Sequence, residues 1–363
     1  MTIKKKPVRI TTYKNCEAKQ INVKDSVLEV LEQQKGEHIS GAELAVRLNV
    51  SRNAVWKAVK SLQEEGYSIT AVTNKGYCLN PATDILSVQS ISKYLLPEMK
   101  HLQLEVYKTI DSTNIRAKEY AAQGKPEGIV VVAESQTAGR GRMGRSFYSP
   151  PVSGVYISFL MRPKFSAQES LFMTTAAAVA AAEAIEEASG NRAEIKWVND
   201  VFCHGKKVCG ILTEASVNVE NGMLEYAVTG IGFNVREPEG GFPEAIREIA
   251  GPIFKDKKDF GLAKSDIDAR SRIAAGMINH FWQYYEHLTE KSFMPEYKKR
   301  SFLLGQKIKT LTDPPVYGVA VDIDEDGHLI LECEDGSRKV LSSGEVSVRP
   351  VKTEAECTDK QNE

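Results

Sequence analysis

The chain has 363 residues, enough for two or three domains, and its 42% hydrophobic and 26% charged residues are typical of an ordinary soluble protein. No apolar run is long enough to cross a membrane, and no apolar core follows the basic start, so we expect neither secretion nor membrane insertion. The net charge of −1 excludes a globally basic nucleic-acid coat but allows a local basic patch.

The six cysteines are scattered along the chain and fit neither a disulfide framework nor a zinc ribbon. Cys203, His204 and Cys209 offer three possible metal ligands, but no fourth ligand lies nearby. Free thiols in a reducing cytoplasm explain the pattern better. We therefore predict a cytoplasmic protein without a metal site built from its own side chains.

Residues 1–24 are polar and rich in lysine, without a periodic pattern, and predict a tail. Residues 25–82 predict three short helices followed by a hairpin at residues 67–79. The sequence Ser40-Gly-Ala-Glu43 has the form of a capping box, and Ser51 is placed to cap the third helix.

The third of these helices has two distinct faces. Val55, Val59 and Leu62 share an apolar face, while basic and amide residues project from the other. This order of elements is that of a winged helix-turn-helix, whose third helix enters the major groove of DNA. A small protein-interaction module with a solvated basic face fits too, although basic residues at the helix start favour DNA. The candidate DNA-binding residues are Ser51, Arg52, Asn53, Lys57 and, at the hairpin tip, Lys75.

Residues 83–301 predict a larger α/β domain. A strand at 102–107 is followed by Asp111-Ser112-Thr113-Asn114, which is placed to cap the next helix. Capping alone can explain these four residues. Hydroxyl groups at a strand-to-helix corner also commonly meet ligands, so Ser112, Thr113 and Asn114 are candidate binding residues.

A strand at residues 128–133 leads into a stretch with three glycines and three arginines, residues 133–147, which we name the Gly-Arg loop. Glycines let the backbone approach a ligand closely, and arginine offers a planar, permanently charged fork. The loop therefore predicts binding of an anion. A solvated charged loop is the plainer explanation, and a long Arg-Gly nucleic-acid segment does not fit so short a stretch.

The spelling Gly139-x-Gly141-x-x-Gly144 also matches the fingerprint of dinucleotide-binding folds. That fingerprint requires a helix to begin at the glycines, so that its N-terminus faces the pyrophosphate. Here Ser149-Pro150-Pro151 follows almost at once and blocks a helix. No acidic residue stands about 20 positions later to hold a ribose, so we reject this interpretation.

The sequence next predicts a strand at 155–160 and an alanine-rich helix at 171–188, and we expect this helix to be buried. After the helix, polar residues interrupt an apolar run. Lys196, Asn199 and Asp200 lie there, and buried polar groups without partners cost about 1–3 kcal/mol each. A structural turn explains Asn199 and Asp200 but not a lysine beside Trp197. Lys207, in the next hairpin, is either a charge stabiliser or an ordinary turn lysine.

A further strand ends at Gly232-Phe-Asn234, where the backbone could approach a ligand. Residues 237–260 predict irregular structure, and 267–288 predict a helix. Residues 302–351 predict five short strands separated by Asp-Gly turns, as in a small β-barrel, and 352–363 predict a disordered tail.

Taken together and in this order, five motifs resemble the family of bifunctional biotin protein ligases and biotin operon repressors. The resemblance covers residues 25–350. It implies an α/β multidomain fold with an N-terminal winged helix-turn-helix, a class II synthetase-like α/β ligase domain with a mixed sheet, and a C-terminal SH3-like β-barrel. The motifs are Asp111-Ser-Thr-Asn114, Gln136-x-x-Gly139-Arg-Gly-Arg-x-Gly-Arg145, Lys196-Trp-x-Asn199-Asp200, Lys207-x-x-Gly210-Ile-Leu and Gly230-x-Gly-x-Asn234, followed by Gly344-Glu345-Val.

The resemblance also implies an activity. Biotin and ATP, with Mg²⁺ expected, form biotinyl-5′-AMP, and a lysine of a biotin carboxyl carrier domain then takes the biotin. The family assigns biotin to Ser112, Thr113, Gln136, Arg140 and the backbone of Gly210, and the nucleotide to Arg142, Arg145, Phe147, Lys196, Asn199 and Asn234. Asp200 is implied either to face the metal and phosphates or to orient Lys196. Asn114, Gly139 and Gly141 complete the implied set of ligand-binding residues. Lys207, with Arg142 and Lys196, is implied to stabilise the transition state.

In this family the adenylate promotes a homodimer that binds two-fold operator DNA, so the same expectation applies here. The chain departs from the family pattern where Phe147 replaces the usual tryptophan, and in its long N-terminal segment. A regulator that binds biotin without ligating it would lack the lysines and arginines that this chain keeps. A ligase whose winged helix has no repressor role, or a lipoate-type ligase of the same fold, are the alternatives.

Overall fold

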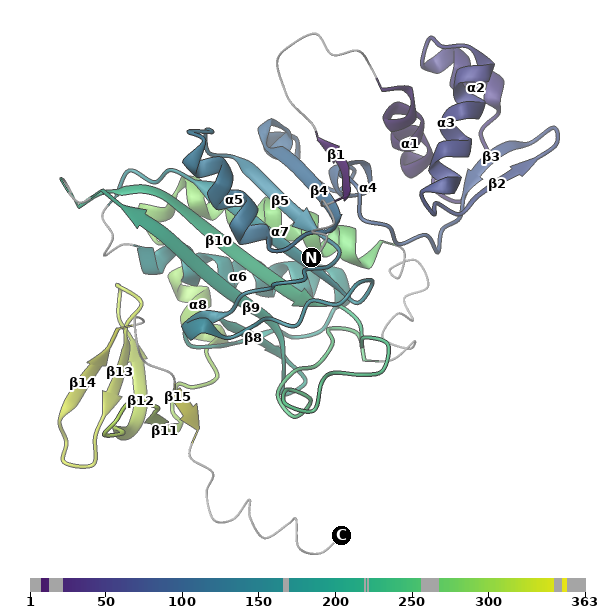
Figure 1. The fold of residues 1–363 in the computed structure, drawn as a ribbon. Helices are drawn as coiled ribbons and strands as arrows, with labels where there is room; N and C mark the ends of the chain where they lie inside the picture. Colours follow the sequence, from purple (N-terminus) through teal and green to yellow (C-terminus); the bar gives the residue numbers. More distant parts are fainter. Residues whose placement is uncertain are drawn as a thin grey trace, which may run out of the picture.

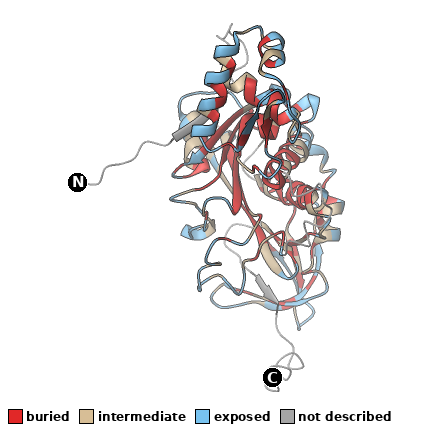
Figure 2. Ribbon diagram, turned by 90° about the vertical axis from the view of Figure 1, so that its right-hand side faces the viewer, coloured by how far each residue is buried: buried red, intermediate tan, exposed pale blue. Residues whose placement is uncertain are grey.

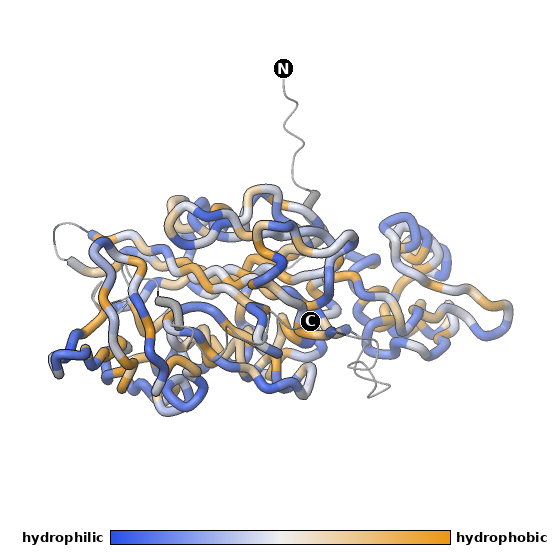
Figure 3. The backbone as a smooth tube through the Cα atoms, turned by 90° about the horizontal axis from the view of Figure 1, so that it is seen from below, coloured by the Kyte–Doolittle hydropathy of each residue, from blue (hydrophilic) through white to orange (hydrophobic). Residues whose placement is uncertain are grey.

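A computed structural model describes residues 8–12, 22–165, 170–218, 220, 222–255, 268–342 and 348–350. The chain forms three parts, with the central α/β domain between an N-terminal helical domain and a small C-terminal sheet (Figure 1). Seen from below, the two smaller domains lie at opposite ends of the central domain (Figure 3). The Gly344-Glu345-Val motif and the expected tail at 352–363 lie outside the described residues.

The N-terminal domain confirms the predicted winged helix-turn-helix. Its two caps are those that the sequence indicates, because Ser40 Oγ accepts from the Glu43 amide and Ser51 Oγ accepts from the Ala54 amide. The apolar face of the third helix packs inward, with Val55 and Leu62 fully buried. The elements are α1 Val23–Gln33, α2 Gly41–Arg47, α3 Arg52–Glu64, β2 Ile69–Val72 and β3 Gly76–Leu79.

The expectation that residues 1–24 form only a tail is wrong for Val8–Thr12. This segment is strand β1, which pairs antiparallel with β4, Gln103–Thr109. Four of its five residues are β-branched, which favours a strand, and β4 otherwise offers an unpaired row of backbone groups. The remaining residues before 22 lie outside the described part of the chain.

The central domain is built on one eight-stranded sheet. The sheet is mixed, as the sequence analysis expected. The strand order is β1-β4-β5-β6-β10-β9-β8-β7, in which only β4 and β5 run parallel among the described pairs. The remaining strands are β5 Ile129–Ala133, β6 Gly154–Met161, β7 Glu194–Lys196, β8 Asp200–Cys203, β9 Lys206–Val217 and β10 Leu224–Asn234.

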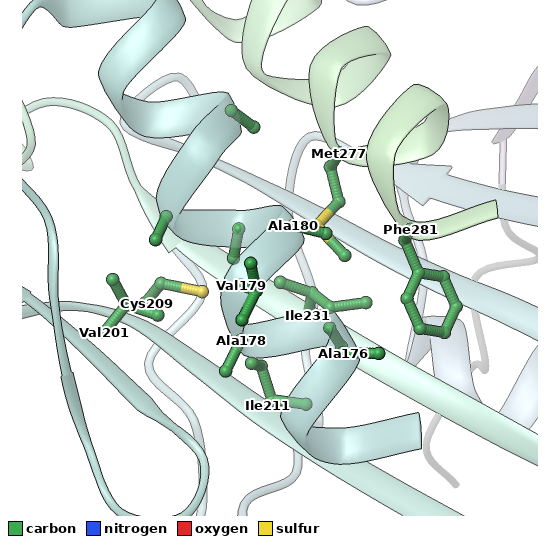
Figure 4. Packing of buried hydrophobic residues seen from close by; sticks show 14 of the residues in the cluster. Ala176, Ala178, Val179, Ala180, Val201, Cys209, Ile211, Ile231, Met277 and Phe281 are labelled. Atoms are coloured by element: carbon green, nitrogen blue, oxygen red, sulfur yellow. The ribbon is translucent and has the colours of Figure 1, made fainter. Parts of the chain in front are cut away.

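One buried helix, α6 Ser170–Ser189, forms the centre of the main core, confirming the sequence prediction. It lies between the sheet and α7, Ala269–Glu286, so that residues of all three layers meet in Figure 4. Its small side chains allow close packing, since a Cβ added at Gly276 of α7 would lie only 3.1 Å from Ala184 Cβ. Figure 2 shows buried residues along the sheet and the helices packed on it.

The other helices are α4 Val88–Ser92, α5 Thr113–Ala122 and α8 Met294–Arg300, with 3₁₀ turns at Pro97–His101, Arg142–Gly144 and Leu288–Glu290. Of these, α5 packs against β5, β6 and β10.

The five strands predicted for the C-terminal domain form one antiparallel sheet in the order β14-β13-β12-β11-β15. The Trp197 indole donates to the Gly327 carbonyl over 2.9 Å, and this bond ties the sheet to the Lys196–Asp200 motif. The strands are β11 Lys307–Thr310, β12 Tyr317–Ile323, β13 Leu329–Glu332, β14 Arg338–Leu341 and β15 Val348–Pro350.

Phe281 of α7 is the natural test of this core, because it is fully buried with its ring 4.7 Å from that of Phe159. Phe281→Ala should lower the free energy of unfolding by about 3–5 kcal/mol, since the cavity forms between α7 and the sheet. Urea titration followed by tryptophan fluorescence measures this loss. The exposed Val340→Ala is the control and should change stability by less than about 0.5 kcal/mol. Equal effects of the two variants would contradict the assigned core.

Candidate functional site

A pocket of about 1010 Å³ opens where the Gly-Arg loop crosses the ends of β8, β9 and β10. It brings together the predicted ligand-binding residues from five separate parts of the central domain. Those lining it are Ser112, Thr113, Asn114, Gln136, Arg140, Gly141, Arg142, Arg145, Phe147, Lys196, Asn199, Asp200, Lys207, Gly210 and Asn234. Gly139 lies behind the wall, where a side chain would collide with the Phe147 carbonyl and Ser149.

A polar network forms one end of the pocket, at the strand-to-helix corner after β4. The Thr113 amide and hydroxyl both donate to Gln136 Oε1, over 2.9 and 3.1 Å. The fully buried Ser158 on β6 lies 2.7 Å from the Thr113 hydroxyl and 2.6 Å from Asn114 Oδ1. Ser112 is the N-cap of α5 but makes no side-chain capping bond, so capping alone does not account for this corner.

The Gly-Arg loop folds back on itself instead of starting an α-helix. Its backbone closes through the Gly141 amide to Arg145 carbonyl bond, 2.7 Å, and the Phe147 amide to Gly139 carbonyl bond, 2.9 Å. Only a 3₁₀ turn stands at Arg142–Gly144, which agrees with the rejection of the dinucleotide fingerprint. Arg142 Nη1 donates to Asn199 Oδ1 over 3.0 Å, so the loop contacts the Lys196–Asp200 motif directly.

Lys207 and Asp200 form an ion pair in the pocket wall, with 2.5 Å between Lys207 Nζ and Asp200 Oδ1. About a quarter of each side chain is exposed, 26% and 22%, so both face the pocket. Asp200 stands between two strands, paired with Lys196 on β7 and with Gly210 on β9. This geometry favours a charge-stabilising role for Lys207 over an ordinary turn lysine.

Positive charge exceeds negative charge along the pocket wall. Burial lowers the pKa of Arg142, although the neighbouring Asp200 opposes that shift. Arginine titrates so far above neutral pH that it remains charged. The cations are Arg140, Arg142, Arg145, Lys196 and Lys207, against the carboxylates of Glu194, Asp200 and Glu248. The excess of two cations makes the pocket suited to an anionic ligand.

The Phe147 ring lies on a flat patch made by two glycines that face each other across β9 and β10, Gly210 and Gly232. A Cβ added at Gly232 would lie 2.5 Å from the ring, and one at Gly210 would lie 2.9 Å from it. Any side chain at either position would therefore displace the aromatic ring. Tyr156 supports the ring edge-on, at 6.3 Å between centroids.

Sequence reasoning missed two members of this site. Ser158 lies in a strand, where a serine gives no local signal. The other, Glu214, accepts from Asn114 Nδ2 over 2.9 Å and from Lys118 Nζ over 2.8 Å, and lies 3.7 Å from Arg140. Burial raises its pKa, but these hydrogen bonds outweigh burial and lower it.

The exposed face of α3 carries the other predicted functional surface. Arg52, Asn53 and Lys57 are exposed there, and Lys75 is exposed at the tip of the β2–β3 hairpin, whereas Ser51 is committed to capping. Trp56 was not among the predicted DNA-binding residues. It is 50% exposed among these cations, and Lys60 Nζ lies 5.4 Å from its ring centre.

Comparison with known proteins matches all three parts of the chain. Residues 24–78 match an HTH domain, 106–234 the biotin/lipoate A/B protein ligase family, and 303–349 the biotin protein ligase C terminal domain. The bifunctional ligase/repressor BirA of Bacillus subtilis is 36% identical over 330 residues, which cover 88% of this chain and 97% of that protein. The chain belongs to the BirA family of bifunctional ligase/repressors.

A more distant bifunctional relative matches most of the chain, whereas the structure of a ligase matches only part of it. BirA of Escherichia coli is 27% identical and covers 86% of this chain and 94% of its own. A biotin protein ligase from Aquifex aeolicus, solved in complex with biotin and ATP, is 30% identical with a TM-score of 0.53. The match covers 68% of this chain and 99% of the Aquifex ligase, so that whole ligase corresponds to about two thirds of this chain.

Two absences concern the described residues only. No group of three His, Cys, Asp or Glu side chains among them could hold a metal ion. Cys203 and Cys209 are free, buried thiols, and burial raises the pKa of Cys203 to about 12. Of the helices in these residues, none is long and apolar enough to span a membrane.

Proposed function

We propose that this chain is an ATP-dependent biotin protein ligase acting through biotinyl-5′-AMP, and a biotin-responsive repressor of transcription. The observation that carries the proposal is the single pocket in which the Ser112–Gln136 polar corner, the Gly-Arg loop and Lys207 meet. Two different ligand types fit its two ends. A winged helix in the same chain supplies the means to bind DNA.

Biotin fits the end of the pocket nearest α5. The hydroxyl groups of Ser112 and Thr113 and the amides of Asn114 and Gln136 can match the donors and acceptors of a cyclic urea. The Phe147 ring lies on the patch at Gly210 and Gly232, from which no side chain projects, and it offers an apolar wall against which a compact fused ring system can pack. Arg140, at the rim, directs positive charge toward the biotin carboxylate.

ATP fits the cationic end, where Arg142, Arg145, Lys196, Asn199 and Asn234 surround the remaining space. The Phe147 ring offers a stacking face for a base or a cover for the biotin rings. A biotin carboxylate oxygen attacks the α-phosphorus, an O–P bond forms, and the bond to the β-phosphate oxygen breaks. Pyrophosphate leaves with the electron pair of that bond.

Lys207 is placed to stabilise the charge that builds up during this displacement. Its ammonium group projects from the start of β9 between the two ends of the pocket, and Asp200 holds it in position. A divalent cation such as Mg²⁺ would neutralise phosphate charge, and Asp200 is the carboxylate best placed to hold it. The protein needs no covalent intermediate, because positioning and charge stabilisation carry this kind of reaction.

In the second step, an uncharged lysine amine of a biotin carboxyl carrier domain attacks the carbonyl carbon of the adenylate. A C–N bond forms, the mixed anhydride C–O bond breaks, AMP leaves with the electron pair of that bond, and the nitrogen releases one proton to solvent. Arg142 and Lys196 lie where the departing phosphate regains its charge. The reaction would take place in the cytoplasm, where carboxylases and ATP occur together.

Lys207→Met should reduce the rate of adenylate formation by about 100-fold or more, because one preorganised charge near the phosphorus is lost. Pyrophosphate release with saturating biotin and ATP measures this rate. Lys299→Met is the control, since Lys299 is 74% exposed and pairs only with Glu296 in its own helix. A Lys207 variant that releases pyrophosphate at the wild-type rate would remove Lys207 from the mechanism.

Arg142→Met should speed the dissociation of the adenylate by about tenfold or more, because a partly buried hydrogen bond from a charged group contributes more than about 1.4 kcal/mol. Asn199 holds the guanidinium in place at the pocket wall. Release of radiolabelled adenylate from preloaded enzyme measures the effect. The control is Arg192→Met, whose side chain is 81% exposed. Equal release rates in the two variants would refute the retaining role.

Repression requires that the winged helix bind a specific operator, and we propose that an adenylate-bound homodimer does so at a two-fold site. The charge on α3 supplies contacts to phosphates, while Trp56 offers an apolar surface for a thymine methyl group. The same face holds Arg52, Asn53 and Lys57, which lets the helix read bases and backbone together.

Trp56→Ala should weaken binding to the specific operator by about tenfold while leaving binding to unrelated DNA nearly unchanged, because base contacts specify and phosphate contacts do not. Lys57→Gln is the matched comparison and should weaken both kinds of DNA alike. Fluorescence anisotropy with biotin and ATP present measures both affinities, on fragments selected by the protein itself. Ligation without any ligand-dependent DNA binding would identify a ligase whose winged helix has no repressor role.

A further inference from the structure

The winged helix and the central domain meet at a joint built from charged side chains. The joint comprises Glu32 of α1, Lys35 just after this helix, Asp84 in the connecting segment, Lys93 after α4, Glu134 after β5, and Asp268 and Arg270 at the start of α7. In Figure 1, α1 faces α4 across this boundary, and the two helices are in contact. None of these residues belongs to the ligand pocket.

One half of the joint is a buried cluster of two lysines and two carboxylates. Lys35 and Lys93 both bind the carboxylate of Asp268, and Lys93 Nζ also lies 2.8 Å from Glu32 Oε2. The Tyr94 hydroxyl donates to Asp268 over 3.0 Å. Burial opposes ionisation of Asp268, but the bonds from the lysines outweigh it and lower its pKa. Each domain contributes both a cation and an anion, so separation would leave buried charges on both sides.

The other half is centred on Arg270, which is only 1% exposed. Its guanidinium binds both the carboxylate and the carbonyl of Asp84, and its Nη2 lies 3.3 Å from Glu134 Oε1. Glu134 also accepts the Leu86 amide over 2.9 Å. Arg236 binds the same carboxylate of Asp84. The segment connecting the two domains is therefore held at Asp84 and Leu86 by three side chains of the central domain.

Two of those side chains stand next to ligand-binding residues in the sequence. Glu134 is two residues before Gln136, which belongs to the polar corner of the pocket. Arg236 is two residues after Asn234, which lines the cationic end. Each of these two side chains therefore links a pocket-lining residue two positions away to the segment at Asp84 and Leu86.

The joint is polar and incompletely paired, unlike the apolar cores on either side. Among the described residues, buried atoms without a hydrogen-bond partner include Thr83 Oγ1, Asp84 Oδ1, both amide atoms of Gln89 and Arg270 Nη1. These unpaired donors and acceptors can form new hydrogen bonds, so the side chains of the joint can adopt a second arrangement. An interdigitated apolar interface would resist such a rearrangement.

We propose that Asp84 and Arg270 are positioning residues that couple the ligand pocket to the winged helix. Filling of the pocket moves Glu134 and Arg236, the bonds to Asp84 and Leu86 change, and the winged helix is held in the orientation that DNA requires. This coupling acts within one protomer, in addition to any effect of dimerisation. The DNA part of the proposal rests on the repressor function proposed above.

The test uses the full-length chain and the isosteric variant Asp84→Asn, which removes the carboxylate charge at the centre of the joint. Hydrogen exchange of a peptide containing the Leu86 amide reports on the joint directly, because that amide is bound to Glu134. In the wild type, biotin with ATP should change its exchange rate at least tenfold. In Asp84→Asn the response should fall below twofold, while the rate of pyrophosphate release stays within threefold of wild type.

DNA binding provides the second measurement. The ratio of operator affinities with and without biotin and ATP should fall at least fivefold in Asp84→Asn, since allosteric coupling is reciprocal between ligand and DNA. Lys298→Gln is the control, because Lys298 joins the central domain to the C-terminal sheet through Asp322, at 3.0 Å. It should leave both the exchange response and the affinity ratio unchanged.

Arg270→Lys is the second variant if circular dichroism shows that Asp84→Asn does not fold. It keeps the buried charge but loses the fork that reaches Asp84 and Glu134 together. The coupling would be overturned if the folded variant kept the wild-type responses of both the exchange rate and the affinity ratio. It would also be overturned if biotin with ATP did not change the exchange rate of the Leu86 amide in the wild type. A wild type that forms adenylate but binds no DNA would overturn only the repressor proposal, because the exchange measurement needs no DNA.

Discussion

The register of the central sheet is the constraint on which the whole site depends. Gly210 faces Gly232 across β9 and β10, and Gly230 faces Ser158 across β10 and β6. The first pairing makes the floor under Phe147, and the second places the hydroxyl that holds Thr113 and Asn114. A slip of one residue would turn each of these groups to the opposite face of the sheet, so the pocket exists in one register only.

Charge is used in two different ways in this molecule. In the pocket, Lys207 and Asp200 are partly exposed, and cations outnumber carboxylates, so a ligand can complete the balance. At the joint, Lys35 and Lys93 are largely buried and balance the carboxylates of Glu32 and Asp268. The first arrangement attracts a mobile anion, whereas the second joins two folded domains.

Much of the fold and most of the pocket could be predicted from the sequence, because caps, turns and the ordered motifs are local signals. Ser40 and Ser51 cap the helices that they were expected to cap. Ser158 and Glu214 could not be found in that way, since their roles arise from strands that meet only in the folded sheet. The role of Arg270 could not be predicted either, because its partners lie 186 and 136 residues away in the sequence. Strand β1 was missed because it forms only by pairing with the edge of β4.

The bond from the Trp197 indole to the Gly327 carbonyl has a consequence for how this chain can be divided. Trp197 is 4% exposed and lies within the motif that supplies Lys196, Asn199 and Asp200 to the pocket. Without the C-terminal sheet, the indole would lose its acceptor and its cover in the same place where the nucleotide is expected. The turn between β12 and β13 thus supports the motif that lines the pocket, so a cut between the central domain and the C-terminal sheet would remove part of that support.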